Sequence, residues 1–104
     1  MNEDIKKLIE ENFKFSDDDI SRIGCIVCLI QYGIYTPAII HHIRRIVTSK
    51  KRKLSPRIPL CTIHHNYGGI GVSVHDGRES FERNFGTEIY LLERTNRELK
   101  NEAS

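Results

Sequence analysis

The stretches Cys25-Ile26-Val27-Cys28 and Cys61-Thr62-Ile63-His64 place four metal-binding side chains in two pairs, and the second pair begins 33 residues after Cys28. These C-x2-C and C-x2-H spacings are typical of zinc knuckles, and two knuckles together supply the four ligands of a closed tetrahedral site. The alternative is three buried cysteines and a surface histidine. Because the paired spacing is fairly specific, we expect a structural zinc ion at these four residues.

The composition indicates a small hydrophobic core, which a bound zinc ion would help to stabilise. The chain has 104 residues, the length of one domain, yet only 38% are hydrophobic and 29% are charged. A core this modest usually needs extra fixation, and zinc contributes on the order of 10 kcal/mol to folding. No apolar run approaches the ~20 residues of a membrane span, and the first residues lack the features of a signal peptide. An odd number of cysteines suits a reducing compartment, so we expect a cytoplasmic protein without membrane contact.

Positive charge is concentrated in the middle of the chain. Residues 1–19 carry a net charge of −4 and residues 76–104 one of −2, whereas residues 20–75 carry +8 with no acidic residue. A basic block between acidic flanks predicts a polyanionic partner, most often nucleic acid. A solvated basic loop is the alternative. The basic residues of the block are Arg22, Arg44, Arg45, Lys50, Lys51, Arg52, Lys53 and Arg57.

Hydrophobic spacing predicts helices at both ends of the chain and short strands between them. We expect an amphipathic helix over residues 2–13, a short helix capped by Ser16 and ended by Gly24, and a charged helix over residues 87–103. The apolar runs 26–30 and 38–40 are expected to form a two-stranded hairpin. Extended chain is expected from Pro56 to Cys61, a helical turn over residues 62–67 and a helix from Arg78 to Phe85.

The fold class that follows is a small α+β domain. It divides into an N-terminal helical arm (1–24), a zinc-stapled core (25–86) and a C-terminal helix (87–104), which together form one domain.

Four histidines remain once the knuckles are accounted for, namely His41, His42, His65 and His75. A single histidine on an apolar strand usually just packs. Four histidines around one zinc knuckle, with a basic loop inserted between them, instead indicate a second site.

The combined motifs resemble the HNH (ββα-metal) endonucleases. The resemblance rests on Cys25-x2-Cys28, on Ile40-His41-His42-Ile43 and on Ile58-Pro59-Leu60-Cys61-x2-His64-His65. The later motifs Gly71-x3-His75, Ser80-Phe81-Glu82 and Phe85-Gly86-Thr87-Glu88 are similar to those of the Ref-type recombination-enhancement nucleases of bacteriophages. Together they cover the chain from Cys25 to Leu92, about two thirds of it.

The resemblance implies a treble-clef ββα-metal core and a role for each histidine. His42 matches the general base, and His41 and His65 match ligands of the catalytic divalent ion (Mg, Mn, Ni, Co or Zn). His75 matches a downstream histidine that would complete a three-imidazole site or else bind the structural zinc. The implied activity is hydrolysis of phosphodiester bonds in DNA, in phage recombination or DNA processing within a bacterial host cell. Arg44, Arg45, Lys50, Lys51, Arg52, Lys53 and Arg57 are the expected DNA contacts.

The chain departs from the family in two places. The Asn or Asp that usually follows the general base is missing between Ile43 and Leu60, where Ser55 is the nearest small polar substitute. An acidic arm also replaces the long basic N-terminal extension of the Ref proteins. Two other classes therefore stay open: a non-catalytic zinc-stapled module that binds nucleic acid, DNA or RNA, and a zinc-stapled adaptor between proteins.

Overall fold

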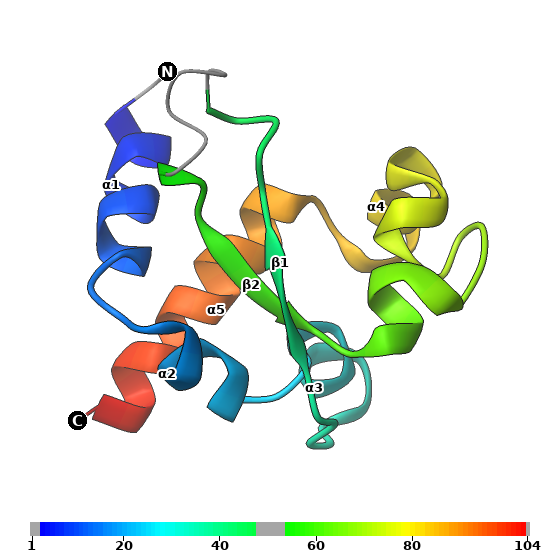
Figure 1. Ribbon diagram of the computed structural model, residues 1–104, viewed down its shortest axis with the longest axis horizontal. Helices are drawn as coiled ribbons and strands as arrows, with labels where there is room; N and C mark the ends of the chain where they lie inside the picture. The colour runs from blue at the N-terminus through cyan, green and yellow to red at the C-terminus, as the bar shows by residue number, and fades with distance from the viewer. Residues whose placement is uncertain (1–2, 48–53, 104) are drawn as a thin grey trace.

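The computed structural model describes residues 3–47 and 54–103, which form a two-stranded sheet surrounded by helices (Figure 1). The sheet and α5 (Glu88–Ala103) occupy the middle, with α1 (Glu3–Asn12) and α2 (Asp17–Arg22) at one end and α4 (Arg78–Phe85) at the other. The remaining elements are α3 (Ile26–Tyr32), β1 (Ile39–His42), β2 (Arg57–Leu60), the π-helical turn η2 (Ile63–Tyr67) and the 3-10 turn η3 (Val74–Asp76). The expected α+β class is therefore confirmed.

The sheet consists of β1 and β2 paired antiparallel, with Ile39 opposite Leu60 and His42 opposite Arg57. Its two strands differ in burial. All four residues of β2 are buried because α2, α3 and α5 pack against this strand. On β1, His41 is buried and His42 is exposed, as expected for neighbouring residues that point to opposite faces of a strand.

The expected strand over residues 26–30 is wrong, because these residues begin α3. Cys25 is the N-cap of this helix, and Gly33 ends it in the left-handed conformation with a φ of 64°. Ile26 and Val27 are buried against the other core residues. A short apolar run fits a buried helix as well as a strand, so the β-branched composition was a poor guide here. The hairpin partner of β1 is instead β2.

The other expected elements are confirmed. Ser16 caps α2 and forms a capping box with Asp19. Residues 56–61 contain β2, residues 62–67 contain η2, and both C-terminal helices form at the expected places. Within the described residues, no helix is long and apolar enough to cross a membrane.

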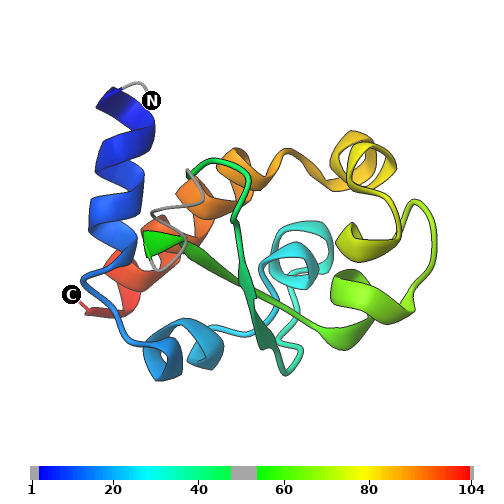
Figure 2. The same ribbon diagram turned by 45° about the horizontal axis from the view of Figure 1, so that its top comes forward.

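The N-terminal helix is tied to the rest of the molecule by a buried asparagine. The Asn12 side chain accepts a hydrogen bond from the Arg57 backbone N–H (2.8 Å) and donates to the Arg57 carbonyl (3.0 Å) and to Asn96 Oδ1 (3.0 Å). Asn96 in turn donates to the Leu8 carbonyl. Figure 2 shows α1 standing beside the C-terminal end of α5, and the two helices are in contact.

The main core surrounds the cysteines. Cys25, Cys28 and Cys61 belong to the same buried cluster as Phe81 and Leu91. Any ion bound by these cysteines would therefore lie inside the core and would join α3 to the end of β2.

Two candidate metal centres

The first candidate centre consists of Cys25, Cys28, Cys61 and His64, which are all buried and whose ligand atoms lie within 4.8 Å of one another. His64 Nδ1 is 3.6 Å from Cys25 Sγ, 3.6 Å from Cys28 Sγ and 3.2 Å from Cys61 Sγ, and the sulfurs of Cys28 and Cys61 are 3.9 Å apart. A tetrahedral zinc with Zn–S of about 2.3 Å and Zn–N of about 2.1 Å has edges of about 3.8 Å and 3.6 Å. The four residues thus fit a structural metal such as zinc.

The electrostatics of this cluster also call for a cation. Burial raises the pKa of the Cys25 thiol to about 12, so a thiolate forms there only if a positive charge compensates it. Burial lowers the pKa of His64, which keeps the imidazole in its neutral, metal-binding form. The three cysteines, all within the described residues, are free thiols. A divalent ion would satisfy both requirements.

Secondary structure holds each ligand of this centre in place. Cys25 and Cys28 lie at the start of α3, and Cys61 immediately follows β2. His64 lies in η2, where the Phe85 ring packs edge-on against the imidazole with centroids 5.0 Å apart. The two knuckles predicted from the sequence therefore meet as expected.

The second candidate centre consists of His41, His65 and His75, whose ligand atoms also lie within 4.8 Å of one another. Nε2 of His65 is 3.0 Å from Nε2 of His75, and the ring of His41 lies 5.3 Å and 5.2 Å from their centroids. Two nitrogens each about 2.1 Å from one ion lie about 3.0–3.4 Å apart. The same separation fits a hydrogen bond between two neutral imidazoles. The cluster joins the end of β1 to η2 and η3.

A hollow of about 280 Å³ opens at this cluster, lined by His41, His42, His65, His75, Ile40 and Arg44. Partial desolvation of the otherwise exposed His42 ring, together with the neighbouring Arg44, lowers the pKa of His42. Burial and the rings of His75 and His41 lower the pKa of His65. Both side chains are therefore neutral near pH 7, as a proton acceptor and a metal ligand must be. His75 lies with the histidine cluster rather than with the cysteines.

Glu88, the first residue of α5, also belongs to this site, although hydrophobic and ligand spacing predict no role for it there. Its Oε2 is 2.7 Å from His41 Nε2 and its Oε1 accepts a hydrogen bond from Arg45 Nε at 2.8 Å. Burial raises the pKa of Glu88, but the hydrogen bonds from His41 and Arg45 outweigh it and hold the pKa below its usual value. The carboxylate is therefore ionised. A sequence signal did exist, because Glu88 is the last residue of the motif Phe85-Gly86-Thr87-Glu88.

The expected DNA-contacting residues that the structure describes differ in their surroundings. Arg44 is exposed beside the hollow, whereas Arg45 pairs with Glu88 and Glu82.

Arg57, a further expected DNA contact, is buried within the fold. It is 8% exposed, and its guanidinium donates hydrogen bonds to Asp17 and to the carbonyls of Asn12 and Phe15. We therefore leave Arg57 out of the DNA-contacting set, because its charge is used within the fold. Lys50, Lys51, Arg52 and Lys53 lie outside the described residues.

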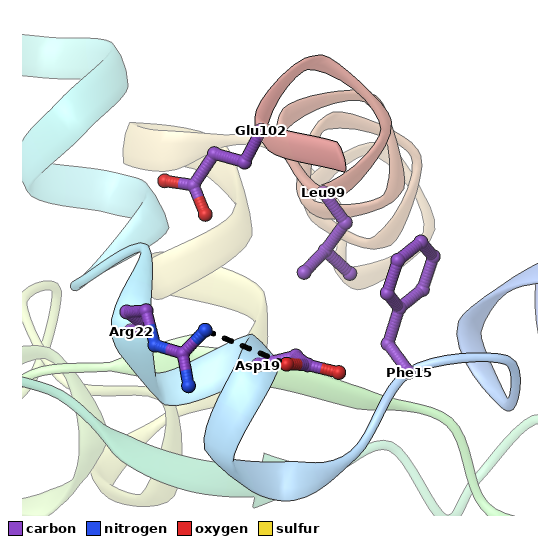
Figure 3. Close-up of a pocket in the computed structure, with 5 residues that line it drawn as sticks. All are labelled: Phe15, Asp19, Arg22, Leu99 and Glu102. Atoms are coloured by element: carbon purple, nitrogen blue, oxygen red, sulfur yellow. Dashed lines mark ion pairs between the residues drawn. The ribbon is translucent and has the colours of Figure 1, made fainter. Parts of the chain in front are cut away.

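A larger hollow of about 520 Å³ lies between α2 and the end of α5 (Figure 3). Phe15 and Leu99 line it together with Asp19, Arg22 and Glu102, and Arg22 pairs with Asp19 at 3.7 Å. The described residues that line it include no histidine or cysteine. Of these two hollows, the smaller one is therefore the one lined by candidate metal-binding side chains. Ser55, the small polar residue nearest to the expected position of the family's Asn or Asp, is buried next to β2.

The fold and the two clusters together define a small α+β protein with a buried Cys3His centre of the kind that binds zinc. Comparisons with protein-family models, with curated proteins and with solved structures found no match. We therefore infer the function from the two clusters.

Proposed function

We propose that this protein is a metal-dependent endonuclease of the HNH (ββα-metal) type that hydrolyses phosphodiester bonds in DNA. Zinc at the Cys3His centre would hold a treble-clef core together, and a second divalent ion would lie at the histidine cluster. The observation that carries the proposal is that one hollow is lined by four histidines and an arginine, namely His41, His42, His65, His75 and Arg44. The resemblance to the phage Ref-type nucleases supports the same assignment and a role in recombination or DNA processing.

Hydrolysis of a phosphodiester requires a proton acceptor for water and stabilisation of the charge that develops on phosphate. A divalent ion bound by His41, His65 and His75 would supply that stabilisation and assist the leaving oxygen. His42 is the general base: it takes a proton as the water oxygen bonds to phosphorus and the bond from phosphorus to O3′ breaks. The O3′ then takes a proton from solvent, which leaves 5′-phosphate and 3′-hydroxyl ends.

Arg44, the charged side chain that lines the hollow, suits a phosphate-binding role. Arg44 is exposed at the hollow's edge, where its guanidinium can bind a backbone phosphate. Because phosphates are the same at every position of DNA, such contacts give affinity without base readout. We therefore propose cleavage with weak sequence preference.

The test is cleavage of plasmid and single-stranded DNA by the zinc-loaded protein, with Mg, Mn, Co, Ni or Zn added in turn. We expect cleavage with at least one of these ions, loss of cleavage with a chelator that spares the structural zinc, and nicks that DNA ligase reseals. His65→Ala purified in the same way controls for contaminating nuclease. DNA binding without cleavage under every metal would instead identify a non-catalytic zinc-stapled module.

A further inference from the structure

Glu88 is a buried carboxylate for which the proposed reaction gives no direct task. Its side chain is 5% exposed and that of His41 is 7% exposed, and their closest atoms are 2.7 Å apart. Burying a charge is costly unless it is paired and hydrogen-bonded. The buried pair of Glu88 and His41 lies beside the hollow, so we ask how Glu88 affects the imidazole of His41.

The contact constrains which nitrogen of His41 carries a proton. A carboxylate oxygen accepts hydrogen bonds, so the short contact requires the proton on Nε2 of His41. In a neutral imidazole the lone pair then lies on Nδ1. Because His41 also lines the hollow with His65 and His75, Nδ1 is the nitrogen left for an ion there.

Glu88 is itself held in place by two residues from outside α5, Arg45 in the turn after β1 and Glu82 on α4. Arg45 donates from Nε to Glu88 Oε1 (2.8 Å), and it also pairs with Glu82 on α4 (3.2 Å). Glu82 accepts the backbone N–H of Glu88 at 2.8 Å. The carboxylate also lies at the first turn of α5, where the helix dipole favours negative charge. Both oxygens of Glu88 therefore have a fixed partner.

We propose that Glu88 is a positioning residue that fixes the tautomer and ring orientation of His41 for a divalent ion bound at the histidine cluster. This inference rests on the proposed function, because it presumes an ion at that cluster. Glu88 would act only through His41, as carboxylates that orient metal-binding histidines do. Removing such a partner typically weakens metal affinity by roughly 10–100-fold.

The test measures Ni²⁺ binding to untagged, zinc-loaded protein by calorimetry, together with the ring-nitrogen NMR shifts of His41 before Ni²⁺ is added. With the pH raised until the ring-nitrogen shifts no longer change, we expect wild-type His41 to be the Nε2–H tautomer. Glu88→Gln should lower Ni²⁺ affinity roughly 10–100-fold and mix the two tautomers, with zinc content and melting temperature unchanged. Glu93→Gln, an exposed glutamate on the same helix, is the matched control and should change neither readout.

Each other outcome overturns the proposal in a recognisable way. Equal Ni²⁺ affinity in Glu88→Gln and wild type would overturn the positioning role while the proposed function stands. Wild-type protein that binds no Ni²⁺ beyond its zinc would overturn the positioning role, whereas the proposed function falls separately if no cleavage is seen under any of the five metals. If Glu88→Gln does not fold, the ring-nitrogen shifts of wild-type His41 still test the proposal. A wild-type His41 protonated on Nδ1 would contradict it.

Discussion

At the scale of single residues, two pairs of adjacent histidines are divided between different environments. His41 is buried against Glu88, whereas His42 is exposed and lines the hollow. His64 faces three cysteines, whereas His65 faces His75. The backbone produces both divisions, because consecutive residues of a strand or a helical turn point in different directions. In the proposed enzyme the general base thus lies next to a ligand of the ion without competing for it.

The pKa of His42 gives a prediction for the pH dependence of cleavage. A general base acts in its neutral form, so a lowered pKa keeps His42 active below the ordinary imidazole value of about 6.5. Besides the partial desolvation of the ring, Arg44 lowers the pKa of His42. Arg44→Gln should therefore move the acid midpoint of kcat/KM to higher pH, whatever it does to the maximum rate. Arg22→Gln is the control, and a midpoint that does not rise in Arg44→Gln would contradict this role of Arg44.

At the scale of elements, η2 connects the two centres. This five-residue turn carries His64 for the Cys3His centre and His65 for the histidine cluster. It begins two residues after Cys61 and is followed by the glycine-rich segment that leads to His75. The conformation of η2 therefore determines how the Cys3His centre and the histidine cluster lie relative to one another.

Alanine substitutions at these two neighbours should have opposite consequences. His64→Ala removes one of four tetrahedral ligands and should release zinc and unfold the domain, because metal binding and folding are coupled. His65→Ala should keep zinc and the melting temperature but lose cleavage, with partial recovery at high divalent concentration. Elemental analysis and thermal melts distinguish the two. A well-folded His64→Ala that retains a full equivalent of zinc would refute the Cys3His assignment.

The elements that could be predicted from the sequence are those with a complete local signal. Ser16 and Asp19 mark the start of α2, and the paired knuckle spacing brings together the Cys3His cluster. The run from Ile26 to Ile30 gave no such signal, since its helix depends on packing against the core. The contact between His41 and Glu88 joins residues 47 positions apart, and hydrophobic periodicity carries no information on such pairs.

At the scale of the whole molecule, the N-terminal helix is an integral part of the fold. The Asn12 side chain hydrogen-bonds to both backbone groups of Arg57 in β2, as a neighbouring strand would. It also donates a hydrogen bond to Asn96 on α5. The Arg57 guanidinium, which was expected to contact DNA, instead donates hydrogen bonds to the backbone carbonyls of Asn12 and Phe15. One charge of the basic block therefore stabilises the fold.

Removing the hydrogen bonds of the Asn12 side chain should lower stability without touching either centre. Asn12→Ala leaves the backbone N–H and carbonyl of Arg57 buried without partners, at about 1–3 kcal/mol for each group. We expect the free energy of unfolding in urea to fall by roughly 2–4 kcal/mol, with zinc content unchanged. Glu10→Ala, on the exposed face of the same helix, should cost far less. Equal stability of the two variants would show that α1 is only loosely attached.

The distribution of charge predicts how DNA binding responds to salt. With Arg57 and Arg45 engaged within the protein, Arg44 and the four residues from Lys50 to Lys53 are the five basic residues we assign to phosphates. Five contacts give a slope of log affinity against log salt of about −4.5 on duplex DNA. Neutralising Lys50 to Lys53 together should reduce it to about −0.9, whereas Lys6→Gln with Lys7→Gln should not. A salt-insensitive affinity would favour the adaptor class.

The most direct test of the nuclease assignment is the single-turnover cleavage rate of His42→Ala against wild type, with the divalent ion that supports the fastest cleavage. His42 is proposed to bind no metal, so zinc content, Ni²⁺ affinity, melting temperature and DNA affinity should stay unchanged. The rate should fall by roughly 10²–10⁴-fold, the usual contribution of a general base. Equal rates for wild type and His42→Ala under every metal would contradict the assignment of a general base and with it the proposed nuclease.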